Sequence, residues 1–167
     1  VSAWIKLHTA GVSGSIVARM NDDDRHRGWD VWVEGKRVGA HLIHAWPENA
    51  AKVLTKNELP TDKWLHLVVA YDGGGKAAGY RVWIYGVKAP LDTKSYGLTE
   101  TTRTEVPLKV WQRHGGGGAV GVAVTDLRVS GGSLEETEVL RLSGAPLAAS
   151  LRRNAADRKP AEVDALF

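Results

Sequence analysis

Short segments in which apolar and polar residues alternate run along the chain from the first residues to about residue 130. A period of two residues is typical of β-strands, because successive side chains point to opposite faces of a sheet. Clusters of Gly, Asp and Asn separate the segments and favour turns. The pattern predicts strands at residues 2–8, 14–20, 29–34, 37–46, 51–56, 64–71, 80–86, 107–112 and 120–130. Many short strands divided by turns indicate an all-β sandwich or jelly roll.

The segment 64–71 shows the alternation most clearly and predicts a strand that is buried on both sides. One face carries Leu65, Leu67, Val69 and Tyr71, and the other carries Trp64, His66, Val68 and Ala70. Because both faces are largely apolar, we expect this strand inside a two-layer structure. Residues 72–75 are Asp-Gly-Gly-Gly and end the strand in a turn.

Composition narrows the class of protein. A chain of 167 residues is long enough for one domain with a core of its own. The net charge of +3 is too small to indicate nucleic-acid binding, and no apolar run is long enough to span a bilayer. The absence of Cys excludes disulfides and thiolate chemistry. Seven Trp stand against one Phe and one Met, and Trp suits both core packing and stacking on a sugar ring.

The composition changes near the end of the chain. After Gly144 the sequence becomes rich in Ala, Leu, Arg and Asp, and Leu147, Leu151 and Ala155 fit one face of a helix. We therefore expect a domain over residues 1–143, followed by a helical extension or linker to a further domain over 144–167. The chain starts on a strand-like segment without Met and ends in a helix-like one, which indicates a piece of a longer protein.

Three motifs, at 64–73, 80–86 and 121–129, together with the helix-like segment 133–142, resemble laminin-G-like and concanavalin A-like lectin and glucanase domains. Tyr85 departs from the pattern, since that family usually has Asp at this turn. The resemblance covers about residues 1–143 and implies two packed antiparallel sheets with a short closing helix. It also implies binding of sugars or proteins, with hydrolysis of glycans only in some members.

A narrower resemblance rests on residues 18–20, 27–30, 46–50 and 103–107 and on the tail 158–167. These segments are similar to the jelly-roll insert of large planctomycete cytochrome-c-domain proteins. The resemblance implies a periplasmic or extracellular location within a larger exported protein. The chain has no Cys-x-x-Cys-His motif, so any haem would lie outside it.

Catalytic and metal signatures are weak. The jelly-roll glucanases carry Glu-x-Asp-x-x-Glu on one strand, which this chain lacks, and the spacing of Asp30 and Glu34 on one strand face does not fit that motif. We therefore expect no catalysis. The acidic segment 21–24 is either a calcium loop or a solvated turn, and Asp72 and Asp126 stand where the resemblance implies structural calcium. No other cofactor is expected.

The candidate ligand site combines aromatic rings with polar groups, as carbohydrate sites do. Alternation along 37–46 places Leu42, His44 and Trp46 on one face, with His41, Ile43 and Ala45 on the other. In the alternative, Trp46 and Trp29 fill the sandwich core and Arg19 pairs with Asp30. The predicted ligand-binding residues, on what would be the concave sheet, are Arg19, Trp32, His44, Trp46, Asn49, Trp83 and Arg113.

Three functions remain open from the sequence. The first is a non-catalytic module that binds a polysaccharide or other glycan within a larger exported protein. The second is a structural or protein-interaction module that positions neighbouring domains of the same chain. The third, which the missing carboxylate motif makes the weakest, is an unusual glycoside hydrolase.

Overall fold

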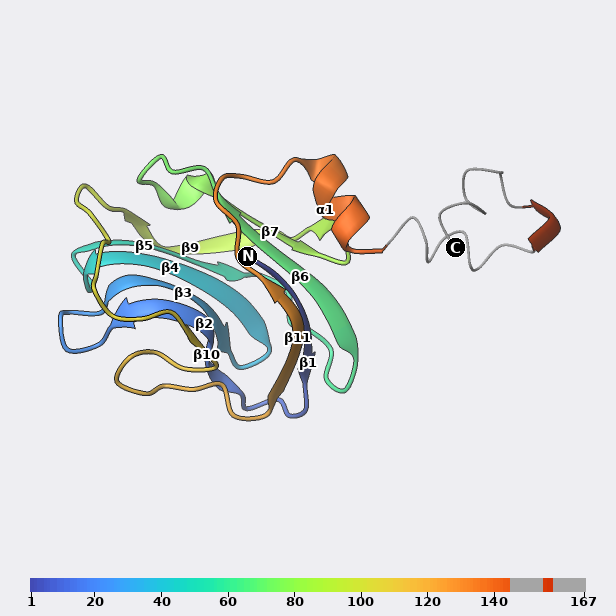
Figure 1. Ribbon diagram of the computed structural model, residues 1–167, viewed down its shortest axis with the longest axis horizontal. Coiled ribbons are helices and arrows are strands. Elements are labelled where there is room, and N and C mark those ends of the chain that lie inside the picture. The colour runs from blue at the N-terminus through green and yellow to red at the C-terminus, as the bar shows by residue number, and fades with distance from the viewer. Residues whose placement is uncertain (145–154, 158–167) are drawn as a thin grey trace.

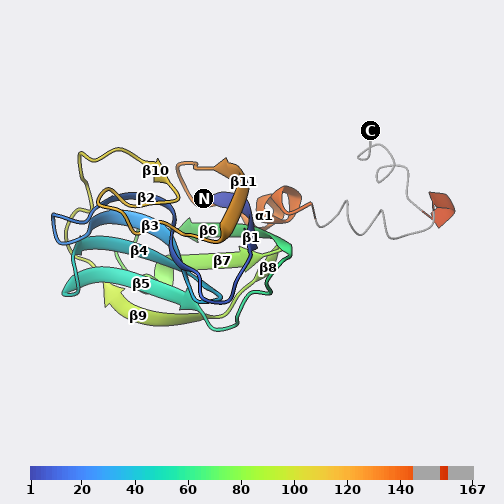
Figure 2. The same ribbon diagram turned by 90° about the horizontal axis from the view of Figure 1, so that it is seen from below.

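The computed structural model describes residues 1–144 and 155–157, and it shows two antiparallel sheets packed face to face (Figures 1 and 2). The five-stranded sheet has the order β11 (Val122–Arg128), β1 (Ser2–Leu7), β6 (Trp64–Tyr71), β7 (Tyr80–Ile84) and β8 (Val87–Lys88). The six-stranded sheet has the order β10 (Lys109–Val110), β2 (Ser13–Asn21), β3 (Arg27–Glu34), β4 (Arg37–Ala45), β5 (Asn49–Thr55) and β9 (Leu91–Gly97). Helix α1 spans Glu136–Leu142, and the short 3₁₀ turns η1 and η2 span Ala77–Gly79 and Ala155–Asp157. The prediction of a jelly-roll sandwich is confirmed.

Each segment predicted as a strand contains one, but two further strands are present. Strand β9 forms the edge of the six-stranded sheet and is largely polar and solvent-accessible, so its sequence carries no apolar alternation. Strand β8 has two residues and pairs with β7 across the turn Tyr85-Gly86. Both turn residues have positive φ, at 52° and 75°, as a two-residue hairpin turn of the I′ type requires.

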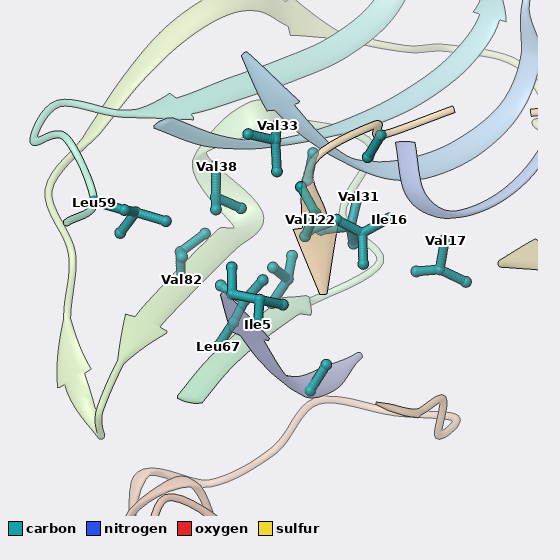
Figure 3. Close-up of a cluster of buried hydrophobic side chains, with 14 of the residues drawn as sticks. Ile5, Ile16, Val17, Val31, Val33, Val38, Leu59, Leu67, Val82 and Val122 are labelled. Carbon is teal, nitrogen blue, oxygen red and sulfur yellow. The ribbon is translucent and has the colours of Figure 1, made fainter. Parts of the chain in front are cut away.

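The core lies between the two sheets and is filled by one face of each (Figure 3). Strand β6 contributes Leu65, Leu67 and Val69, which pack against Val31 and Val38 and their neighbours from the other sheet. Burying a side chain of this kind stabilises the fold by about 1.5–3 kcal/mol each. This is the face of β6 that the alternation assigned to Leu65, Leu67, Val69 and Tyr71.

The second apolar face of β6 is covered by helix α1 rather than by a sheet (Figure 1). Val68 and Ala70 pack there with Trp83 of β7 and with Val139 of α1. Burial of β6 on both sides is therefore confirmed. Trp83 lies in this layer with 3% of its surface exposed, on the sheet opposite to that of Trp32.

His66 occupies the same outer face of β6 and has a structural role. Its ring lies 5.3 Å from that of Trp4, centroid to centroid, and the side chain is buried. Burial lowers the pKa of His66, with the nearby charges of Asp126 and Arg128 acting in opposite directions. The imidazole is therefore held in its neutral form.

The predicted helical extension over 144–167 lies largely outside the described residues, which after Gly144 comprise only the turn η2. Across residues 1–144 and 155–157, no helix has the length and apolar character needed to cross a membrane.

Replacement of Trp83 tests the layer beneath α1. Trp83→Ala should lower the free energy of unfolding by about 3–5 kcal/mol, because it leaves a cavity among buried apolar side chains. Trp64→Ala on the neighbouring strand is the control, since Trp64 is 42% exposed, and it should change stability far less. Denaturant unfolding measures both, and equal losses would contradict this assignment of the two residues.

Candidate functional site

The strand register aligns one polar row across the outer face of the six-stranded sheet, the face turned away from the core. Residues directly opposite one another on neighbouring strands point to the same side of a sheet. Asp30 of β3 pairs with His41 of β4, and His41 pairs with Lys52 of β5. The row continues to the two edges through Ala18 and Lys109 on one side and Ser95 on the other.

Asp30 is the centre of this row and is fully buried. His41 Nδ1 donates to its Oδ1 at 2.5 Å, and Arg113 Nε donates to its Oδ2 at 2.7 Å. Burial alone would raise the pKa of Asp30, but the charges and hydrogen bonds of His41 and Arg113 outweigh burial and hold that pKa below its ordinary value. Asp30 is therefore a buried carboxylate that stays ionised at neutral pH with both oxygens occupied.

The hydrogen bond to Asp30 also determines the orientation of His41. An ionised carboxylate can only accept, so the ring proton that it receives must sit on Nδ1. The other ring nitrogen, Nε2, makes no hydrogen bond within the described residues and is not a buried atom. His41 lines a pocket on this face of the sheet, and its Nε2 is the ring nitrogen that the bond to Asp30 leaves free.

The pocket has a volume of about 240 Å³ and two aromatic walls. The ring centroids of Trp32 and Trp46 each lie 6.2 Å from that of the His41 imidazole. Both rings are close to perpendicular to it, with interplanar angles of 76° and 88°. They stand on opposite sides of it. Trp32 lies beyond Asp30 in the chain direction of β3. Trp46 packs beside Ile43, which lies beyond His41 in the chain direction of β4, and the two strands run in opposite directions. The imidazole thus forms the floor between two indole rings.

Charged groups complete the lining. The guanidinium of Arg113 lies 4.2 Å from the centre of the Trp32 ring, and Lys52 Nζ lies 5.7 Å from that of Trp46. Both distances are within the range of cation–π attraction. Lys52 also bonds to Glu34 at 3.2 Å, and His26 lies at the rim. The pocket therefore offers aromatic surface and polar donors together.

Arg113 reaches the sheet from the long segment between β9 and β11, which crosses β2 and carries β10 (Figures 1 and 2). The acidic turn 21–24 holds this segment. Asp22 Oδ2 accepts from the amide of Gly115 at 2.8 Å, and its Oδ1 lies 3.2 Å from His26 Nδ1. Asp22 thus anchors the glycine-rich loop, and binding of calcium by this turn stays a prediction.

Three of the predicted ligand residues, Trp32, Trp46 and Arg113, come together in the pocket. Three others hold the crossing segment instead. Arg19 donates to the carbonyls of Thr104 and Val106, and His44 Nδ1 contacts the carbonyl of Thr101 at 2.8 Å. Asn49 and Thr99 bond to each other through side chain and amide. The seventh, Trp83, lies on the other sheet beneath α1.

One structural expectation about these residues was wrong, and so was the ion pair that the alternative contained. Leu42 packs against the inter-sheet core, whereas Trp46 packs on the outer face with Ile43, so Leu42 and Trp46 do not share a face. The cause is a β-bulge, because the pairing of β4 with β5 shifts between Ile43 and Ala45. Asp30 is paired by Arg113 rather than by Arg19.

The sequence reading did not assign Asp30 and His41 to the ligand site. A signal for them exists in the two-residue turn Gly35-Lys36 between adjacent strands. Such a turn pairs Glu34 with Arg37, and the same register then carries Asp30 to a position opposite His41.

The candidate calcium residues are engaged within their own segments. Asp72 Oδ1 accepts from the amide of Gly74 at 2.8 Å, and Asp126 binds Arg128 through both oxygens, at 2.9 and 3.0 Å. The part of the chain described here holds no group of three or more His, Cys, Asp or Glu side chains that could bind a metal ion. These contacts do not fit a preformed calcium site, and structural calcium stays a prediction.

Comparison with known proteins identifies relatives of the fold. The family model of the concanavalin A-like lectin/glucanases superfamily matches residues 1–140. A search of curated protein sequences finds no match. Among solved structures, the binding domain of botulinum neurotoxin serotype G is similar, with a TM-score of 0.56 and 13% identity over 89% of this chain. The match covers 36% of that structure's chain, and at this identity it shows the fold alone.

Removal of the buried charge tests the centre of the site. Asp30→Asn should lower the free energy of unfolding at neutral pH by about 3–5 kcal/mol, because it removes the carboxylate 2.7 Å from Arg113 and leaves only that of Asp22, at 3.9 Å. The pKa of Asp30 is depressed below 3.8, so its stabilising effect is complete above about pH 4 and is lost as the pH falls through the folded-state pKa. The difference in free energy of unfolding between wild type and variant should therefore become smaller as the pH falls.

Asp126→Asn is the matched control, since Asp126 also pairs with an Arg but both partners are about half exposed. It should change stability by less than about 1 kcal/mol. Urea unfolding from neutral to acidic pH measures the two variants. Similar losses in both would contradict the role of Asp30 as a buried, paired charge.

Calcium is tested by calorimetry of the domain in chelator and in excess calcium. Binding to the native state would raise the unfolding temperature by mass action. We expect the same midpoint in both, because Arg128 neutralises Asp126 and the turn occupies Asp72. A higher midpoint in calcium that is lost in Asp72→Asn would establish the calcium site and contradict this expectation.

Proposed function

The chain belongs to the concanavalin A-like lectin/glucanases superfamily, and we propose that it is a non-catalytic module that binds carbohydrate in the pocket of Trp32, His41 and Trp46. The observation behind this proposal is that the indole rings of Trp32 and Trp46 lie on either side of the imidazole of His41. The apolar face of a sugar ring packs on an aromatic side chain, while its hydroxyls need hydrogen-bond partners. A volume of about 240 Å³ suits one residue of a longer glycan.

The state of the carboxylates supports binding without hydrolysis. Glycosidases use two carboxyl groups that face the scissile bond. Here Asp30 is fully buried with both oxygens occupied, and Glu34 is engaged by Lys52. Ser13 lines the same pocket, but no hydroxyl bonds to His41 in the described part of the chain, so His41 has no nucleophile to activate.

A second candidate function, docking of a neighbouring domain, is favoured by a different surface. Trp64, Tyr85, Val87 and Leu140 are all exposed on the five-stranded sheet and α1. The turn after Tyr85 lies against Leu140, which places the hairpin beside the helix. Apolar residues gathered in this way are typical of protein interfaces.

The resemblance to an insert of planctomycete cytochrome-c-domain proteins supports a place in a larger exported protein, periplasmic or extracellular. In that setting the two surfaces have separate roles. The six-stranded sheet binds the glycan, and the patch around Tyr85 and Leu140 contacts the neighbouring domain. Replacements on one surface should leave the other function intact.

A glycan array followed by calorimetry tests the proposal. Trp32→Ala and Trp46→Ala should each weaken binding of the selected glycan by about tenfold or more, as expected when a contact worth at least 1.4 kcal/mol is lost. Trp64→Ala is the control and should bind as the wild type does. Trp46 is partly exposed, so its loss should destabilise the fold by less than the 3–5 kcal/mol of a buried Trp.

Two outcomes would count against the proposal. Binding that survives both pocket replacements and is lost in Trp64→Ala would move the site to the other sheet. Release of reducing ends from the selected glycan, abolished by His41→Ala, would show catalysis in the pocket.

A further inference from the structure

We propose that the sugar held in this pocket carries an oxyanion, a carboxylate or a sulfate, and that doubly protonated His41 binds it through Nε2 beside Arg113 and Lys52. The inference rests on the proposed function and names the chemical class of its ligand. It follows from the N–H donors of the pocket that are not used in the contacts described above.

The fully buried acceptor of the pocket, Asp30, is already occupied. Both oxygens of Asp30 are bonded, to His41 and to Arg113. Glu34 accepts from Lys52, and Asp22 accepts from Gly115 and contacts His26. Of these carboxylates, Glu34 uses only one oxygen in its contact with Lys52, so most of the acceptors beside the pocket are engaged within the protein.

The donors are in surplus. A guanidinium has several N–H groups, and the described contacts of Arg113 use only Nε within hydrogen-bond distance. The ammonium group of Lys52 donates one hydrogen bond to Glu34 and has two further N–H donors. These side chains are 14% and 17% exposed, so water screens their charges less than it does at the surface. A donor-rich, partly desolvated pocket is complementary to a ligand rich in acceptors and negative charge.

His41 adds a dependence on pH. With one proton, on Nδ1, its Nε2 accepts from a sugar hydroxyl, and with two protons Nε2 donates to an oxyanion. The charged groups around it are Asp30 on β3, Lys52 on β5 and Arg113 on the crossing segment, with Glu34 and His26 at the rim. A bound anion adds negative charge beside the imidazole and favours the second proton. Affinity for the anion should therefore rise as the pH falls, whereas affinity for a neutral sugar should not.

The test compares pairs of glycans that differ only in the charged group. Oligogalacturonate against its methyl ester tests a carboxylate, and chondroitin sulfate against unsulfated chondroitin tests a sulfate. Calorimetry at about pH 5.5 and about pH 8 compares the pairs at two pH values between which the ligand charges stay constant. We expect at least one charged member to bind about tenfold more tightly than its partner at the lower pH. This preference should shrink at the higher pH.

His41→Asn isolates the contact. The amide nitrogen of Asn can replace Nδ1 in the bond to Asp30 while nothing reaches the position of Nε2. The variant should lose the pH-dependent part of the preference for the charged partner over the uncharged one. Arg103→Gln is the matched control, because Arg103 lies on the crossing segment, is 85% exposed and should leave all affinities unchanged. If His41→Asn unfolds, Lys52→Gln should reduce the preference for the charged partner in its place.

The outcomes separate the two proposals. Equal binding of charged and uncharged partners at both pH values would overturn the anionic ligand and leave the carbohydrate module intact. A preference for the charged form that Arg103→Gln weakens as much as His41→Asn does would also overturn it, since the attraction would then belong to the whole surface. Failure to bind any glycan would overturn the proposed function itself.

Discussion

The buried carboxylate of Asp30 is the interaction on which the outer face of the six-stranded sheet depends. A charge removed from water is tolerated only when it is paired and hydrogen-bonded. Asp30 meets this requirement with partners from two parts of the chain, His41 on the adjacent strand and Arg113 from a loop 83 residues away. The need to satisfy one charge thus brings the crossing segment onto the sheet and orients the imidazole at the floor of the pocket.

The two faces of the same strands serve different purposes. On the inner face, Val31 and Ala40 join the apolar core that holds the sheets together. One residue away along each strand, Asp30 and His41 form the polar centre of the outer face. Because the alternation of a strand separates these sets completely, a change in the polar row leaves the inter-sheet packing in place. This separation allows a binding site to vary on a constant sandwich, which is why the fold alone does not identify a ligand.

Several residues that have the chemistry of a ligand site serve the fold instead. Arg19, His44 and Asn49 carry donors and acceptors typical of carbohydrate sites, yet their described contacts go to the backbone or side chains of the segment 99–106. That segment crosses the sheet with few regular strand pairings of its own, and its polar groups need partners. These residues hold the segment 99–106, which leads along the chain to Arg113, and they do not line the pocket themselves.

Alternation along the chain predicts most strands of the sandwich and the burial of β6 on both faces, and the short turn Gly35-Lys36 sets the register in which Asp30 pairs with His41, although that pairing was not predicted. These features are local, because alternation and short turns act within one or two strands. Three features could not be predicted in this way: Trp83 lies beneath α1, Arg113 rather than Arg19 binds Asp30, and a bulge brings Trp46 to the outer face. Each of these depends on which distant segments pack together, and a periodicity of two residues carries no information about the sheet or loop that a side chain will meet.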